Sequence, residues 1–304
     1  MDELREACAV VAARARSVSI VTGSVAAYAA TLPARAGSAS LPAPPATPAE
    51  REARAAYWLT MDAINFGSGW FPTLRKRAGL SGYNTIAAAL EDQFRDGAWS
   101  AAELTRMTAA TLGPALVQDP DHELMALYAA SLRDLGEHVS EGYRGRFAAV
   151  ADAAGGSAVR LARRLGSWAS FADCARYGNI ELPFLKRAQI AAADLARAGV
   201  AEFDDLPRLT MFADNLVPHV LRLDGVLRFD AELVGCIARE ELLEHGSEVE
   251  VEIRACAVHA VELLVAAAPP PRPTAARVDQ ILWQRGQQPR YKAVPRHRSR
   301  CTAY

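Results

Sequence analysis

The chain of 304 residues is 51% hydrophobic and 23% charged, which suffices for a large buried core and argues against global disorder. Its 34 basic and 35 acidic residues nearly balance, which argues against nucleic-acid binding through bulk charge. The five cysteines are far apart, and the apolar stretch 9–30 is interrupted by Arg14 and Arg16. We therefore expect no disulfide framework, zinc site or membrane span, and a reduced, cytoplasmic setting.

The expected elements are almost all helices. Residues 1–30 carry good helix formers and apolar positions throughout, and predict one helix. Recurring prolines predict an extended connector over Leu32–Pro48. Thr47 then supplies an N-cap, with Pro at the first helical position and an acid two residues further on, so a helix should run from there to the glycines at 67 and 69.

Further helices are expected near 83–95, 100–111, 120–138, 145–165, 170–176, 183–198, 208–223, 230–243, 248–267 and 272–285. The alternation of β-branched residues that is typical of a strand is nearly absent, and only Val251–Ile253 hints at a strand. The sequence therefore predicts a mainly α protein that forms a single domain over residues 1–304.

The first stretch with possible chemistry is Asp62–Pro72. It combines a carboxylate, the amide of Asn65 and the rings of Phe66 and Trp70 with two glycines at a helix end. Glycine permits close approach of a ligand, and aromatic rings beside a polar helix end suit stacking on a planar base. A helix C-terminus beside core aromatics explains the same pattern equally well.

The second stretch is Phe184–Gln189, at the start of an apolar helix. Lys186 and Arg187 in a first helical turn oppose the helix dipole, unless they face an anion such as a phosphate. Taken alone, these two cations are better explained as solvated surface.

The third stretch is Leu209–Arg222, in which Asp214 stands in an apolar run. A carboxylate there is disfavoured unless it is paired or functional, although it could simply cap a helix near Pro218. His219 is interpreted as a hydrogen-bonded structural histidine. In a fourth stretch, Glu250 and Arg254 are spaced for a structural ion pair on one helix face.

Several motifs are absent from the sequence. It contains no G-x-x-x-x-G-K-[ST], G-x-G-x-x-G, H-E-x-x-H or G-x-S-x-G. Nucleoside triphosphate, dinucleotide, zinc peptidase and serine hydrolase chemistry all lose support.

These stretches occur in an order that resembles the queuosine salvage family, the queuosine 5′-phosphate N-glycosylase/hydrolases. The resemblance runs from about residue 57 to the end, whereas residues 1–50 match only loosely. The matching pieces are Asp62–Phe71, Phe184–Gln189, Leu209–Arg222, Gly225–Leu227, Glu250–Leu264, Val278–Trp283 and Pro295–Tyr304.

The resemblance implies an all-helical fold related to helix-hairpin-helix DNA glycosylases. It also implies hydrolysis of queuosine 5′-monophosphate to queuine and ribose 5-phosphate, with no metal and no other cofactor. Asp214 takes the place of the catalytic aspartate, and Phe212 and Ala213 are its neighbours. Asp279 and Trp283 lie in the last motif, which borders the base site in the family. Gln288 stands before Pro289 where many relatives carry an acid.

Cleavage of an N-riboside passes through an oxocarbenium-like state, which a carboxylate such as Asp214 stabilises while it activates water. For the base we expect hydrogen bonds from Asp62, Asn65 or Asp279. For the 5′-phosphate we expect a cation, Lys186 or Arg298. The partner is then a small molecule, with no membrane and no stable nucleic-acid complex.

The alternative is a non-catalytic nucleic-acid-binding module on a glycosylase-like helical fold. A scaffold without a small-molecule site is a third hypothesis, but it leaves the cluster of Phe66, Trp70 and Asp214 unexplained.

Overall fold

The structure is a computed structural model that describes residues 1–33 and 43–304. The described residues are mainly helical, as the sequence predicted. The α-helices are α1 (Asp2–Arg14), α2 (Thr22–Ala30), α3 (Pro48–Ala63), α4 (Gly82–Asp96), α5 (Ala101–Leu104), α6 (Ala109–Ala115), α7 (Glu123–Tyr143), α8 (Phe147–Asp152), α9 (Ala158–Gly166), α10 (Lys186–Arg197), α11 (Leu216–Leu223), α12 (Ala231–Ala238), α13 (Glu248–Ala267), α14 (Ala275–Arg285) and α15 (Pro289–Lys292).

Short strands and 3₁₀ turns complete the described elements. Strand β1 (Val18–Ile20) pairs antiparallel with β4 (Leu227–Phe229), and β2 (Ala175–Tyr177) pairs antiparallel with β3 (Ile180–Leu182). The 3₁₀ turns are η1 (Phe71–Thr73), η2 (Ala169–Phe171) and η3 (Leu206–Arg208).

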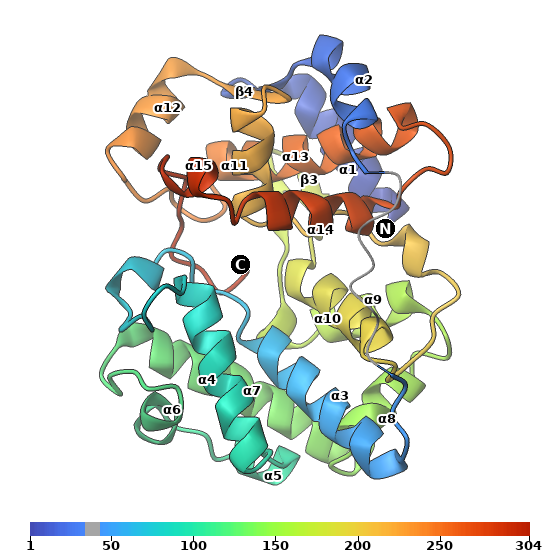
Figure 1. Cartoon of the computed structure of the whole chain (residues 1–304), viewed down its shortest axis with the longest axis vertical. Coiled ribbons are helices and arrows are strands. Elements are labelled where there is room, and N and C mark those ends of the chain that lie inside the picture. Colours follow the sequence, from blue (N-terminus) through green and yellow to red (C-terminus); the bar gives the residue numbers. More distant parts are fainter. Residues whose placement is uncertain (34–42) are drawn as a thin grey trace.

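The helices form two groups with the C-terminal end of the chain between them (Figure 1). Helices α1 and α2 pack against α13, in the same group as α11, α12, α14 and α15. Helices α3 to α8 form the other group, with α10 packed against α3 and α9 packed against α10. The start and the end of the sequence therefore build one group together, and the middle of the sequence builds the other.

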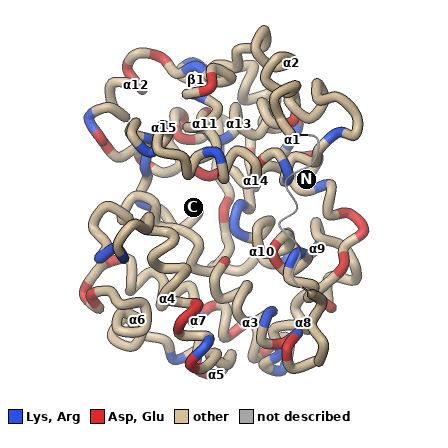
Figure 2. The backbone as a smooth tube through the Cα atoms, in the orientation of Figure 1, with Lys and Arg blue, Asp and Glu red and all other residues tan. Residues whose placement is uncertain are grey.

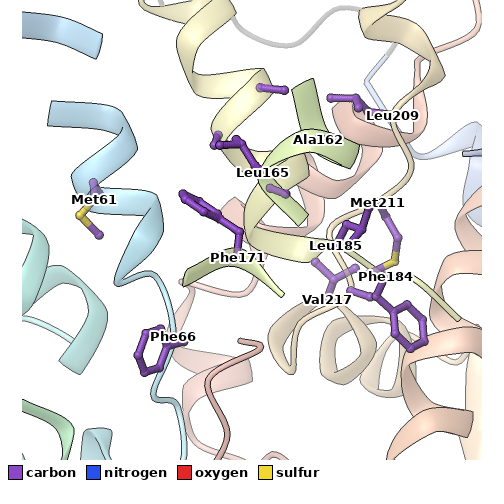
Figure 3. Close-up of a cluster of buried hydrophobic side chains, with 14 of the residues drawn as sticks. Met61, Phe66, Ala162, Leu165, Phe171, Phe184, Leu185, Leu209, Met211 and Val217 are labelled. Atoms are coloured by element: carbon purple, nitrogen blue, oxygen red, sulfur yellow. The ribbon is translucent and has the colours of Figure 1, made fainter. Parts of the chain in front are cut away.

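Helix α13 is the central helix of the first group. Most of it is buried, including apolar residues such as Val251, Ile253 and Val258, which is typical of a core helix. Apolar side chains from the segments before α10 and α11 and from α11 itself add to the core, among them Phe184, Met211 and Val217 (Figure 3). The hint of a strand at Val251–Ile253 was wrong, because these residues lie inside α13.

The expected helix over residues 1–30 is in fact two helices that flank β1. The backbone N–H groups of Arg16 and Ser17 donate to the buried carboxylate of Glu252 at 2.9 and 2.8 Å, so they are unavailable to a helix. The β-branched run that begins at Val18 then pairs with β4. Of the predicted connector Leu32–Pro48, residues 34–42 lie outside the described residues, and residues 43–47 are neither helix nor strand.

Further helix predictions were wrong in part. The expected helices over 100–111 and 145–165 are each divided into two, α5 and α6 in the first and α8 and α9 in the second. Residues 170–176 contain η2 and the start of a β-hairpin, which turns at Gly178 with a positive φ of 58°. In 208–223 only the second half is helical. The residues directly before α11 are not helical, because side chains bind their amides: Gln189 accepts from the amide of Thr210 at 2.9 Å, and Asp279 accepts from the amide of Phe212 at 3.0 Å.

The last ten residues follow α15 without forming a helix, and they dock onto both groups. The carbonyl of His297 accepts from Asn215 at 3.1 Å, and the carbonyl of Tyr304 accepts from the backbone of Gly67 at 3.2 Å. A Cβ at Gly69 would lie 2.5 Å from the carbonyl oxygen of Ser299, so glycine allows this close approach. Within residues 1–33 and 43–304, no helix has the length and apolarity needed to cross a membrane.

Candidate active site

A cavity of about 680 Å³ is lined by residues of both helical groups and of the end of the chain. This volume is in the range of small-molecule sites. Its wall combines the loop after α3, one face of α10, the segment before α11, one face of α14 and the C-terminal tail. The aromatic lining is Trp58, Phe66, Phe71, Tyr83, Phe212, Trp283 and Tyr304, and the charged lining is Lys186, Asp194, Arg197, Asp214, Arg277, Asp279, Lys292 and Arg296.

Asp214 lies in the cavity wall directly before α11. Its Oδ1 accepts hydrogen bonds from the backbone amides of Leu216 at 2.9 Å and Val217 at 3.0 Å. The positive end of the α11 dipole therefore supports a negative charge on this carboxylate. Among the described residues, Oδ2 has no hydrogen-bond partner and is available to a ligand. Asp214 thus both caps the helix and contributes to the cavity, which joins the two interpretations that the sequence left open.

Lys186 is buried, with 5% of its surface exposed, so its interpretation as solvated surface was wrong. Its Nζ donates to the carbonyl of Asn65 at 2.9 Å and to Oδ1 of the same residue at 3.2 Å. Burial lowers the pKa of Lys186 to about 8, although the negative charge of Asp214 opposes this shift. The lysine is therefore a cation near neutral pH that is bound to Asn65 and attracted by the charge of Asp214.

Asp279, on α14, is a second carboxyl group in the cavity wall and is 5% exposed. Its Oδ1 accepts from the backbone amide of Phe212 at 3.0 Å. Burial, and then the charge of Asp214, raise the pKa of Asp279 well above its usual value. Asp279 is therefore suited to carry a proton and to donate it in a hydrogen bond to a ligand.

Asp62 and Asp194 form a third acidic region where α3 and α10 pack together. Asp62 is fully buried beneath the lining, and the amide of Asn65 lies 3.5 Å from its Oδ1. Burial and then the charge of Asp194 raise the pKa of Asp62. Asp194 lines the cavity, where burial raises its pKa to about 6 although Arg197 pairs with it at 2.9 Å.

Aromatic rings from both helical groups contribute to the wall. Trp283 on α14 and Tyr83 on α4 meet edge to face, with ring centroids 5.9 Å apart. Phe66 is held by an edge contact with Tyr128 at 4.9 Å and by the guanidinium of Arg187, 4.9 Å above its ring. Such walls bind planar rings well.

A buried ion pair behind the cavity fixes two of its segments. Arg254, on α13, contacts both carboxylate oxygens of Asp173, at 3.0 and 2.7 Å, and its Nε donates to the carbonyl of Ala213 at 2.9 Å. Asp173 in turn accepts from the backbone amide of Lys186 at 2.9 Å. The expected pair with Glu250 is also present, at 3.8 Å.

The structure brings most of the predicted site residues together, but not all of them. Asp214, Phe212, Asn65, Phe66, Lys186, Asp279 and Trp283 line the cavity. Asp62 and Ala213 are buried and do not line it. Three others lie outside the lining: the Trp70 indole donates to Glu123 at 2.7 Å, Arg298 pairs with Glu240 at 3.4 Å, and Gln288 is exposed. His219 is the structural histidine that the sequence predicted, 2.9 Å from the carbonyl of Tyr291.

The sequence interpretation missed several lining residues. Helical spacing from Lys186 carries Asp194 and Arg197 to the same face of α10, so periodicity could have found them. Nothing local distinguishes Arg296 from the other tail arginines. Within residues 1–33 and 43–304, no group of three or more His, Cys, Asp or Glu side chains is arranged to bind a metal ion.

The fold and cavity define a class: a helical protein with a cavity of small-molecule size whose wall combines aromatic and charged side chains. Comparison with known proteins specifies the family. The family model described as "Queuosine salvage protein" matches residues 45–304. The chain therefore belongs to the queuosine salvage protein family.

Several relatives are named queuosine 5′-phosphate N-glycosylase/hydrolase. The one from Sphaerobacter thermophilus is 38% identical over 269 residues, which cover 84% of this chain and 82% of the relative. The one from Mus musculus is 32% identical over 189 residues, 57% of this chain and 56% of the relative. The one from Bos taurus is 29% identical over 245 residues, 74% of this chain and 72% of the relative.

Proposed function

We propose that this chain hydrolyses the N-glycosidic bond of queuosine 5′-phosphate and releases queuine and ribose 5-phosphate. The names of its relatives supply the reaction. The observation that supports it most is the carboxylate of Asp214, which is anchored through one oxygen at the start of α11 and lies in a cavity large enough for a nucleotide. Water supplies the hydroxyl group that ends on C1′, and the base gains a proton.

In this proposal Asp214 is the catalytic residue. As the bond to the base breaks, positive charge develops on the ribose ring, and a carboxylate beside C1′ stabilises it. The same group can align the attacking water and accept its proton. The two amide hydrogen bonds to Oδ1 hold the carboxylate in one orientation, so little reorganisation is needed during the reaction.

The leaving base needs help of another kind. Queuine is a 7-deazapurine and lacks the N7 at which a purine base can be protonated. We assign Asp279 the role of a neutral acid that donates a hydrogen bond to the departing base, because burial raises the pKa of its carboxyl group. Phe66, Phe212 and Trp283 then enclose the planar ring system, and Asn65 contributes amide contacts to its polar edge.

The acidic region suits the remaining part of the base. Queuine carries a secondary ammonium and a cyclopentene diol, both of which are hydrogen-bond donors to a carboxylate. Asp194 lines the cavity and Asp62 lies beneath it, so we propose that Asp194 contacts this substituent. We also propose a cytoplasmic protein in which residues 1–304 act as one catalytic unit on a free nucleotide, without a stable nucleic-acid complex. The expected relation to helix-hairpin-helix glycosylases stays a prediction.

The experiment is to incubate the purified protein with queuosine 5′-phosphate and to follow free queuine by mass spectrometry. Queuosine nucleoside and queuosine-containing tRNA serve as parallel substrates. The proposal expects queuine from the nucleotide and none from intact tRNA. Binding of tRNA without release of queuine from any substrate would instead favour the nucleic-acid-binding module.

A further inference from the structure

Arg296 is a cation in the cavity wall that lacks a partner in the described residues. Its Nε is buried without a hydrogen bond, and its guanidinium forms no ion pair with residues 1–33 or 43–304. Burial lowers the pKa of this side chain, while the charge of Asp214 opposes that shift. A partly buried guanidinium without an acceptor is costly, because it has lost water and gained nothing in exchange.

The other arginines of the tail differ from Arg296 in this respect. Arg298 pairs with Glu240 at 3.4 Å. Arg300 pairs with Glu123 at 3.5 Å and lies 5.8 Å above the ring of Trp70. Neither side chain lines the cavity. Arg296 is thus the arginine of Pro295–Tyr304 whose charge is left for a ligand.

A second cation lies close in sequence. Lys292, the last residue of α15, lines the same cavity and is exposed. Figure 2 shows basic positions on α15 and on the segment that follows it. In contrast, the Nζ of Lys186 already donates to two oxygens of Asn65, which leaves it less free for an anion.

We propose that Arg296 binds the 5′-phosphate of the substrate and sets the preference for nucleotide over nucleoside. This inference rests on the proposed function. A guanidinium binds phosphate through two parallel hydrogen bonds, which fixes orientation as well as position. The contact holds the ribose so that C1′ faces Asp214, and it satisfies the donor that the protein leaves unpaired. Lys292 adds charge at the open side of the same subsite.

The test compares two substrates in three variants. Arg296→Met removes the charge, and Arg296→Lys keeps the charge but loses the planar fork. Arg272→Met, at an exposed position outside the cavity, changes the net charge equally and is the control. For Arg296→Met we expect kcat/KM on queuosine 5′-phosphate to fall about 10- to 100-fold, mainly through KM, whereas kcat/KM on queuosine falls less than about threefold. On queuosine 5′-phosphate, kcat/KM of Arg296→Lys should lie between those of Arg296→Met and the unmodified protein, and kcat/KM of Arg272→Met should match that of the unmodified protein.

Equal losses of kcat/KM on both substrates would overturn the proposal, because Arg296 would then act by stabilising the fold or through its electrostatic effect on Asp214. A second measurement does not depend on turnover: calorimetric binding of ribose 5-phosphate and of inorganic phosphate. The unmodified protein should bind ribose 5-phosphate at least about tenfold more tightly than Arg296→Met. Equal binding by the two proteins would overturn the inference even if queuine is released. If no queuine is released but Arg296 is needed for ribose 5-phosphate binding, the proposed function fails and the anion site stands.

Discussion

Replacing Arg254 by methionine should destabilise the protein strongly. The guanidinium is fully buried, contacts both oxygens of Asp173 and lies 4.0 Å from the ring centre of Phe184. Methionine fills much of the same space, so the packing loss is small, but the carboxylate of Asp173 loses its charged partner in the core. Breaking a buried pair on one side costs about 3–5 kcal/mol, a large part of the stability of a typical domain.

The measurement is urea unfolding followed by circular dichroism. Arg95→Met is the matched control, because Arg95 pairs with Glu91 and Asp92 on the exposed face of α4 and should contribute at most about 1 kcal/mol. The double variant Arg254→Met with Asp173→Leu should lose less than the sum of the two single variants, because the Asp173 carboxylate, which loses its partner in Arg254→Met, is then absent. A loss of under about 1 kcal/mol for Arg254→Met, or strict additivity in the double variant, would refute the reasoning.

Two further predictions follow from the tail and from the buried lysine. Gly69→Ala should cost about 1–3 kcal/mol of stability and reduce activity, because its Cβ would lie 2.5 Å from the carbonyl oxygen of Ser299. The control Gly23→Ala, whose Cβ would have no atom within 4 Å, should lose no stability. Equal melting temperatures for these two variants would contradict the docked tail. Lys186→Met should lower turnover of nucleotide and nucleoside alike. In the unmodified protein kcat/KM should fall as pH rises through about 8, where the lysine loses its proton, and this alkaline limb should vanish in the variant. A pH profile that keeps the limb in Lys186→Met would assign it to another group.

The same lysine also contributes to the pH dependence of stability. Its pKa in the folded protein is about 8, below the usual value of 10.5, so between these values the unfolded chain binds more protons than the folded one. Stability that depends on Lys186 therefore rises with pH across this window. Urea unfolding at several pH values should show a rise for the unmodified protein that is smaller in Lys186→Met.

Regular helices could be predicted from local sequence, whereas the interruptions could not. Thr47 and Pro48 indicate the start of α3, because a helix cap involves residues only a few positions apart. The side chain of Thr47 does accept a hydrogen bond from the backbone amide of Glu50. The break between α1 and α2 depends on Glu252, which is distant in sequence and binds the amides of residues 16 and 17. No local pattern carries that information.

The candidate site could be predicted to a similar extent. Asp214 and Asp279 stand in recognisable motifs, and the structure brings both into one cavity. The charge state of a group depends on its surroundings, however, and sequence alone suggested a solvated Lys186. Sequence alone could not predict the unpaired guanidinium of Arg296 either, because it depends on which distant acids pair with the neighbouring arginines of the tail.

The most direct test of the central claim is the turnover of queuosine 5′-phosphate by Asp214→Asn. Asparagine is nearly isosteric and its side-chain oxygen can still accept from the amides of Leu216 and Val217, so folding and melting temperature should be unchanged. The negative charge beside C1′ is lost, and kcat should fall by at least about 10³-fold. Queuine release within tenfold of the unmodified protein, at an unchanged melting temperature, would contradict the assignment of Asp214 as the catalytic carboxylate.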